Sequence, residues 1–539
     1  MMSGARSAVK QALGSFPGAA DWFQDLAGGS RIPAHGYSLE SVAGLLPRWV
    51  EAARHARMVD SGLPKKKVLV IGYLQWWLEH ACALSLLLAA TGSQVALAIV
   101  PYRRWMHPVP RFDARRQSRY LRRAMAPIAP LVRLEDLTEG PRRNIPAALQ
   151  EALEEQSRTD VQYTLQREEL DLSLGTHEQA LFRLRMARNC SAASRALDLV
   201  ASGEFDVVIV PNGSILEFGA VYQTARYLGR RVVTYEFGEQ RGRMWLAQDD
   251  EVMRLDTHAL WKARGQDPLD EGEMTALREL YAARRGGKLW AHFGRQWQAG
   301  ESQGALAVRQ ELGLDPSRPV ALLCTNVVGD SLALRRAVFT DGMADWLART
   351  VEYFASHSEA QLVVRVLPGE LLGAGHPSAE IVREAVPELP RHVVVVPPES
   401  KVNTYDLIEL AHVGLVYTTT VGLEMAMNGV PVIVAGKTHY RGRGFTCDPE
   451  SAEEYLQMVA AQLARPAGQS LSDEQVQLAW RYAYRFFFDY PFPFPWHLVH
   501  FWEDLRERPL EAVVMPEGHR AYRRTMHALL GEPIGWGRD

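Results

Sequence analysis

Short apolar runs alternate with helix-periodic segments through the first half of the chain. The runs at 68–74, 94–100, 205–213 and 231–236 are typical of buried parallel strands. Helical patterns at 78–90 and 217–228 lie between them. Strands that alternate with helices in this way predict a doubly wound α/β sheet.

The same alternation starts again near residue 319 and continues to residue 435. The strands that it predicts are 319–325, 361–366, 392–396, 414–417 and 431–435. The helices that it predicts are 341–356, 378–385, 404–411 and 421–428. We therefore expect two tandem doubly wound, Rossmann-like domains.

The remaining segments complete the expected domain organisation. Residues 112–200 are rich in helical patterns and charges, which is typical of a helical insertion. The end of the chain is helical and then proline-broken and aromatic, so we expect it to pack back on the first domain. The predicted division is an N-terminal helical extension at 1–64, the first domain at 65–313, the second at 314–473 and a C-terminal tail at 474–539.

Composition narrows the class of protein. The 539 residues are 47% hydrophobic and 23% charged, with a net charge of −3, so bulk electrostatics do not favour nucleic acid. The four cysteines lie far apart without metal-ligand spacing, which is typical of reduced thiols in the cytosol. No apolar stretch approaches the roughly 20 residues that span a bilayer, and the N-terminus lacks a signal-peptide core. We expect a soluble, cytoplasmic protein.

A basic, aromatic segment at 102–123 has two interpretations. It contains Tyr102, Trp105 and several arginines. The first interpretation is a solvated basic helix face. The second is a surface that contacts an anionic glycan or anionic lipid, which would place the protein peripherally at the inner face of a membrane.

The segment 415–446 carries the clearest chemical pattern. Its strand ends at Thr418, Thr419 and Thr420, and a helix follows. Helix N-termini leave N–H groups without partners, and threonine hydroxyls add donors, so this turn can bind phosphate. Glu424 follows Thr420 by four residues and shares its side of the helix, within reach of a sugar. The alternative is a threonine that only caps the helix.

This segment resembles the C-terminal motif of capsule-polysaccharide glycosyltransferases, bacterial enzymes related to the capsule Kdo transferases. The matching residues are Thr418 to Thr420, Gly422-Leu423-Glu424, Gly429-Val430-Pro431-Val432, His439-Tyr440-Arg441-Gly442 and Gly444-Phe445-Thr446, with Thr325-Asn326, Asp330 and the segments 364–370 and 402–406 upstream. The resemblance covers residues 319–489. It implies a GT-B fold, a nucleotide-sugar donor as substrate, a glycan or glycolipid acceptor, and no metal or other cofactor.

One position departs from that family. The family has Arg-x-His-Pro after the second strand of this domain, and its histidine contacts the donor phosphate. This chain has Leu367 there, and His376-Pro377 follows nine residues later. The departure bears on the donor type and on catalytic competence.

Polar residues at strand ends are the candidate ligands of a donor, because ligands of open α/β sheets bind there. The candidates are Asn326, Arg365, Glu370, Asn403, Thr404, Tyr405, Thr418, Thr419, Thr420, Gly422, Glu424, Tyr440 and Arg441. The alternatives are a sheet-edge salt bridge for Arg365, a helix cap for Asn403 and Thr404, and an exposed turn for Tyr440 and Arg441.

Glycosyl transfer also needs a base for the acceptor hydroxyl. Glu236 ends a strand before Gly238 and is the candidate base, while Asp330 is the competing candidate. Glu236 pairing with Arg241 or Arg243 is the structural alternative. Glu217 is a further acid near a strand end, and His80 is a candidate for acceptor contact.

The sequence thus predicts a glycosyltransferase of capsule or surface-polysaccharide synthesis. A nucleotide-sugar epimerase on the same fold and a non-catalytic glycan-binding protein remain alternatives. Leu367 in place of the family histidine is what makes the binding protein an alternative.

Overall fold

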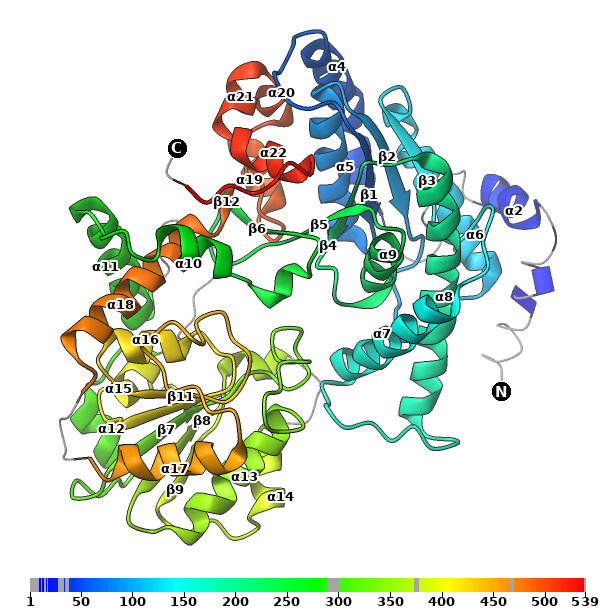
Figure 1. Cartoon of the computed structure of the whole chain (residues 1–539). Helices are drawn as coiled ribbons and strands as arrows, with labels where there is room; N and C mark the ends of the chain where they lie inside the picture. Colours follow the sequence, from blue (N-terminus) through cyan, green and yellow to red (C-terminus); the bar gives the residue numbers. More distant parts are fainter. Residues whose placement is uncertain are drawn as a thin grey trace. The chain divides into compact units, whose positions relative to one another are not determined.

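The computed structural model divides the chain into two units, which are described separately (Figure 1). It describes residues 9–537 apart from 11, 14–15, 17, 28–32, 34–37, 289–299, 373–377 and 466–469. The first unit comprises Met1–Asp160, Asp171–Met253 and Phe492–Gly535. The second unit comprises Val161–Leu170, Arg254–Pro491 and Trp536–Asp539.

A seven-stranded sheet forms the centre of the first unit, in the order β12-β6-β5-β4-β1-β2-β3. The adjacent strands β5, β4, β1, β2 and β3 are mutually parallel, and β6 and β12 are antiparallel to their neighbours. The central strands are continuous runs of Val, Leu and Ile because helices cover both of their faces. The strands are β1 (Lys67–Gly72), β2 (Gln94–Ile99), β3 (Val132–Asp136), β4 (Val207–Pro211), β5 (Arg231–Glu236), β6 (Arg243–Gln248) and β12 (Phe492–Pro493).

Helices from both ends of the chain complete this unit. They are α2 (Ala19–Ala27), α3 (Glu40–Ala43), α4 (Leu46–Arg57), α5 (Gln75–Ala90), α6 (Arg111–Ala124), η1 (Ala126–Ile128), α7 (Ala147–Leu165), which runs on into the second unit, α8 (His177–Gly203), α9 (Leu216–Tyr227), α19 (Phe501–Glu507), α20 (Leu510–Val513), α21 (Pro516–Ala521) and α22 (Arg523–Leu529). No helix within the described ranges is long and apolar enough to cross a membrane.

The second unit has a five-stranded parallel sheet, in the order β11-β10-β7-β8-β9. Its strands are β7 (Val320–Cys324), β8 (Gln361–Arg365), β9 (Val393–Val396), β10 (Val413–Val416) and β11 (Val432–Val434). Its helical segments are η2 (Val252–Arg254), which begins in the first unit, α10 (His258–Arg264), α11 (Glu271–Arg285), α12 (Ala305–Glu311), α13 (Met343–Ser356), η3 (Pro368–Leu372), α14 (Ser378–Ala385), α15 (Thr404–Ile408), α16 (Val421–Met427), α17 (Ala452–Leu463), α18 (Asp473–Tyr484) and a π-helical turn η4 (Arg485–Asp489).

The parallel strands of both sheets have the same winding, which confirms the predicted fold class. In each, the first strand in the chain lies centrally, the next two extend to one side and the fourth and fifth to the other. The winding direction therefore reverses between β1 and β4 in the first unit, and between β7 and β10 in the second. Ligands of doubly wound sheets bind at the carboxyl ends of strands at this point.

The observed division of the chain differs from the predicted one. The predicted boundary between residues 313 and 314 falls inside the second unit, which begins again at Arg254. Helices α10 and α11 belong there because they pack against the C-terminal helices: Thr257 contacts the Tyr482 hydroxyl at 2.7 Å, and Arg485 pairs with Glu273 at 3.3 Å. Of the predicted tail, residues 492–535 pack on the first unit, whereas residues before Phe492 belong to the second.

Three strands of the first sheet were not predicted. β3 lies in the segment interpreted as a helical insertion and pairs with β2 alone, and β6 and β12 lie at the opposite edge. Edge strands are half exposed and carry charged residues, as in the sequence VRLED of β3, so they lack the apolar run of a central strand.

Candidate functional site

The strand ends at the reversal point of the second sheet lie in one row. Val416, Cys324 and Arg365 are paired across β10, β7 and β8, so the residues after them emerge at the same edge. Side-chain hydrogen bonds join the segments that follow these strands. The Asn326 amide oxygen accepts from the Thr418 N–H at 3.1 Å, and the Thr325 hydroxyl accepts from the Leu367 N–H at 3.1 Å. Asn326 and Thr418 are thus adjacent, although they are 92 positions apart.

The turn after β10 presents hydrogen-bond donors without partners. The N–H groups of Thr419, Thr420 and Val421 donate to no group in the described part of the chain. The same is true of the Thr419 and Thr420 hydroxyls, and Thr420 makes no side-chain cap. Because α16 has seven residues, an anion at this turn would be bound by these donors rather than by a long helix dipole.

Tyr440 holds the backbone of this turn in place. Its buried hydroxyl donates to the Thr419 carbonyl oxygen at 2.6 Å, which orients that peptide. Gly422 makes the approach possible, because a Cβ at this position would overlap the Tyr440 hydroxyl. Thr418 is held as well, since its hydroxyl donates to the Leu332 carbonyl oxygen at 3.1 Å. The open donors of the turn therefore sit on a fixed backbone.

Glu424 lies in a buried ion pair that the sequence did not predict. Its Oε1 accepts from Arg284 Nε at 2.5 Å and from the Tyr405 hydroxyl at 2.8 Å. Its other oxygen, Oε2, accepts no hydrogen bond from the residues that the structure describes. Burial, and then the Glu424 carboxylate, hold the pKa of Tyr405 well above its usual value, so Tyr405 stays a donor.

Arg365 and Arg441 hold loops of the second unit. Arg365 is buried and donates to the carbonyl oxygens of Pro397 at 2.9 Å and Ser400 at 3.5 Å, and burial lowers its pKa. Arg441 donates to the Val434 carbonyl oxygen at 2.6 Å and pairs with Glu450 at 2.9 Å. Their roles in donor binding remain predictions.

Other predicted donor ligands cap helices. The Asn403 side chain accepts from the Tyr405 N–H at 2.8 Å at the start of α15, in line with the capping interpretation. Thr404 is the first residue of α15, and its hydroxyl contacts Arg365 Nε at 3.5 Å. Glu370 accepts from the Ser378 hydroxyl at 2.8 Å at the start of α14. His376 and Pro377 lie outside the described residues.

Asp330 stabilises its own turn after β7. Its Oδ1 accepts from the Leu332 N–H at 2.9 Å and from the Ser331 hydroxyl at 3.2 Å. The role of Asp330 as a base stays a prediction. Among the described residues, no group of three or more His, Cys, Asp and Glu could hold a metal ion.

Glu236 ends β5, next to the reversal point of the first sheet. It accepts from the Asn212 side-chain amide at 3.0 Å and from the Phe237 N–H at 3.0 Å. Asn212 follows β4 in a left-handed conformation with φ of 58°, and Leu74 follows the adjacent β1 with φ of 62°. Strained backbone of this kind is concentrated at functional sites. Arg241, an alternative partner of Glu236, pairs with Asp504 at 2.5 Å.

Glu217 is part of a fully buried charge cluster rather than an exposed acid. Arg185 pairs with Glu217 at 2.9 Å and with Asp160 at 3.1 Å, and all three side chains have no solvent exposure. The Tyr102 hydroxyl donates to Glu217 at 2.5 Å. Burial would raise the pKa of Glu217, but Arg185 and Arg188 outweigh it and lower that pKa, so the carboxylate stays charged.

His80, a candidate for acceptor contact, lies in the core of the first unit. Its ring is fully buried between Tyr235, Phe237, Phe494 and Phe501, at centroid distances of 5.0 to 5.7 Å. Burial lowers its pKa to about 3. In the second unit, burial and then the Arg443 charge lower the pKa of His439 to about 3 as well. Both rings are therefore neutral in the folded chain near neutral pH.

These two histidines predict a loss of stability on acidification. Below pH 6.5 the unfolded chain protonates both rings, whereas the folded chain does so only near pH 3, so unfolding takes up protons between these values. Each histidine should lower the free energy of unfolding by about 2 kcal/mol at about pH 5 relative to neutral pH. Urea unfolding at the two pH values measures this difference. His80→Asn should reduce the difference, and the exposed control His258→Asn should not; an unchanged difference in His80→Asn would contradict the assignment.

Comparisons with known proteins find similarity among solved structures alone. No protein-family model matches the chain, and no curated protein matches it. A beta Kdo 2,4 transferase, KpsC of Thermosulfurimonas dismutans, is 17% identical with a TM-score of 0.33, over 53% of this chain and 85% of that one. The UDP-GlcNAc 2-epimerase of Neisseria meningitidis is 11% identical with a TM-score of 0.24, over 77% and 94%.

A third similar structure is the glycosyltransferase SsfS6 of Streptomyces sp. SF2575 in complex with thymidine diphosphate. It is 14% identical with a TM-score of 0.21, over 78% of this chain and 95% of that one. The similar structures thus include Kdo transferases, another glycosyltransferase and an epimerase.

Proposed function

We propose that this chain transfers a sugar from a nucleotide-sugar donor to a glycan or glycolipid acceptor in the synthesis of capsule or another surface polysaccharide. The observation that carries the proposal is the turn after β10, where three N–H groups and two hydroxyls lack partners among the described residues. They lie at the reversal point of a doubly wound sheet. Donors fixed in this way stabilise the charge of a phosphate leaving group.

The second unit supplies the donor site in this proposal. The phosphates bind the N–H groups of Thr419, Thr420 and Val421 and the two threonine hydroxyls. Glu424 accepts from a ribose hydroxyl through Oε2, while Arg284 and Tyr405 hold Oε1. These donors stabilise the charge of the leaving group by hydrogen bonds, without a metal ion or another cofactor.

The first unit supplies the acceptor side. Glu236 removes the proton of an acceptor hydroxyl while the acceptor oxygen bonds to the anomeric carbon and the nucleotide leaves. Asn212 and the Phe237 N–H orient the Glu236 carboxylate for this role. We propose a cytoplasmic location, where nucleotide sugars are available.

Replacing both threonines tests the donor site. The Thr419→Ala/Thr420→Ala variant loses two hydroxyl donors to a charged group, each worth about 1.5–3 kcal/mol. Nucleotide affinity should therefore fall at least tenfold while the unfolding temperature of the free protein stays unchanged. Thermal shifts with CMP, UDP, GDP and dTDP identify the nucleotide, and calorimetry then measures its affinity.

The matched control is Thr419→Ser/Thr420→Ser, which keeps both hydroxyls and should keep most of the affinity. Equal affinity of the alanine variant and the unaltered chain would overturn the phosphate assignment. Product analysis with the identified donor separates the activities: a glycosylated acceptor supports a transferase, a converted donor sugar would indicate an epimerase, and unchanged donor would indicate a binding protein.

A further inference from the structure

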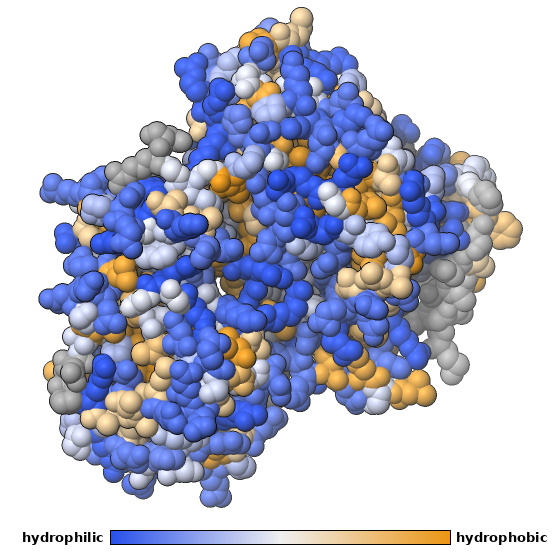
Figure 2. All heavy atoms as spheres, in the orientation of Figure 1, coloured by the Kyte–Doolittle hydropathy of each residue, from blue (hydrophilic) through white to orange (hydrophobic). Residues whose placement is uncertain are grey.

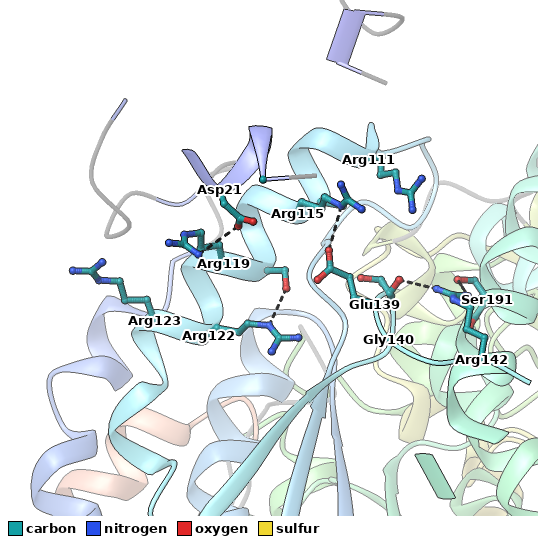
Figure 3. A pocket seen from close by; sticks show the side chains of 14 residues that line it. Asp21, Arg111, Arg115, Arg119, Arg122, Arg123, Glu139, Gly140, Arg142 and Ser191 are labelled. Atoms are coloured by element: carbon teal, nitrogen blue, oxygen red, sulfur yellow. Dashed lines mark hydrogen bonds and ion pairs between the residues drawn. The ribbon is translucent and has the colours of Figure 1, made fainter. Parts of the chain in front are cut away.

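A strongly basic cavity lies in the first unit, lined by α6 and by residues that follow the carboxyl end of β3. Its volume is about 1090 Å³. Figure 3 shows α6 along one side of it and the loop after β3, with Arg142, on the other. Six arginines and two carboxylates line it, a net excess of four positive charges on a chain whose net charge is −3. The arginines are Arg111, Arg115, Arg119, Arg122, Arg123 and Arg142.

These arginines differ in whether a carboxylate of the protein pairs with them. Arg119 pairs with Asp25 at 2.7 Å, and Arg115 with Glu139 at 3.5 Å. Arg122 and Arg123, in the last turn of α6, are exposed and form no salt bridge with a described carboxylate. The cavity therefore keeps an uncompensated positive charge at its solvent side, which favours an anionic partner.

Helix α2 packs beside this cavity, with Ala20 buried and the Phe23 ring 5.5 Å from the Phe112 ring of α6, but it leaves two large apolar side chains in solvent. Its polar residues face α6: Gln24 accepts from Arg116 at 2.8 Å, and Asp25 pairs with Arg119. Trp22 and Leu26, one turn apart, are 68% and 66% exposed. Phe16, just before the helix, is also exposed, and hydrophobic side chains are visible at the surface where α2 lies (Figures 1 and 2).

An ordinary surface helix exposes polar side chains on the side away from its neighbour, whereas α2 exposes Trp22 and Leu26 there. Exposed apolar side chains beside a basic surface are the pattern of a helix that lies in the interface of an anionic membrane. A soluble acidic glycan would satisfy the arginines but would leave Trp22 and Leu26 in water. A lipid surface satisfies both sets, because Trp is favoured at the level of the headgroups and the phosphates lie beside it.

We propose that this surface, formed by Trp22 and Leu26 of α2 and by Arg122 and Arg123 of α6, binds an anionic lipid bilayer. The apolar side chains enter the headgroup region, and the arginines contact lipid phosphates. The inference does not depend on the proposed transferase activity.

Sedimentation of the full chain with vesicles tests this proposal. Vesicles of phosphatidylcholine containing about one-third phosphatidylglycerol should bind the chain at least tenfold more strongly than phosphatidylcholine alone, and added salt should weaken this binding. Arg122→Ala/Arg123→Ala should lower it about 30-fold, because each basic side chain contributes about 1 kcal/mol at such a surface and 1.4 kcal/mol corresponds to tenfold. Arg54→Ala/Arg57→Ala, an exposed pair on α4, is the control and should bind normally.

A second variant separates insertion from simple charge attraction. Trp22→Ala should weaken binding at high salt as well as at low salt, whereas Trp76→Ala, which removes an equally exposed tryptophan, should have no effect. Thermal unfolding establishes that each variant is folded. The proposal is overturned if neither vesicle binds, if Arg122→Ala/Arg123→Ala binds like the unaltered chain, or if the chain binds soluble oligogalacturonate through these arginines but not vesicles.

Discussion

Replacing Glu236 with glutamine is expected to lower turnover by at least 100-fold, because a general base typically contributes 10²–10⁴-fold to the rate. Glutamine keeps the shape of the side chain and one acceptor oxygen, so one of the two bonds from Asn212 and the Phe237 N–H is retained and the fold should persist. Nucleotide affinity should stay unchanged, because the proposed donor site lies in the other unit. Steady-state kinetics with the identified donor, together with calorimetry, measure the two quantities.

Asp330→Asn is the matched comparison, since Asp330 was the competing base and also follows a strand. Asparagine keeps an oxygen that accepts from the Leu332 N–H, so this variant should fold normally. Loss of turnover in Asp330→Asn with normal turnover in Glu236→Gln would move the base to the second unit. Normal turnover in both would mean that another group takes the proton.

Replacing Arg185 with methionine is expected to destabilise the first unit by about 3–5 kcal/mol, because removing one member of a buried ion pair leaves an uncompensated charge. Here two carboxylates, Glu217 and Asp160, would lose their partner in surroundings without solvent. The effect should be largest near neutral pH, because Arg185 and Arg188 lower the pKa of Glu217 and this carboxylate is charged there. Urea unfolding followed by circular dichroism measures the change.

Arg48→Met is the control for a surface ion pair of the same unit. Arg48 pairs with Glu511 at 2.9 Å, but its side chain is 70% exposed, so its loss should cost less than about 1 kcal/mol. Adding Glu217→Gln and Asp160→Asn to Arg185→Met should recover part of the stability by removing the unpaired charges. If Arg185→Met is as mild as Arg48→Met, the cluster does not contribute to stability in the way its burial indicates.

The sequence alone determined the central strands of both sheets and the position of the donor turn. Strands β1, β4, β7 and β10 are apolar runs because helices cover both of their faces, and this burial leaves a local signal. Thr418, Thr419 and Thr420 follow such a run directly, so their place at a strand end could be predicted. The strands β3, β6 and β12 could not, since β3 and β6 are only partly buried and carry mixed residues, and β12 has only two residues.

Tertiary structure decided which distant residues meet. The partner of Glu424 is Arg284, 140 positions away, and the cluster around Arg185 joins residues of α7, α8 and α9. A buried carboxylate requires a cation, but any element that packs against it can supply one, so no local pattern identifies the partner. The same holds for Asp21 and Arg122, which line one cavity because α2 packs on α6. Periodicity along the chain thus determined the elements, and packing between them determined the chemistry of their side chains.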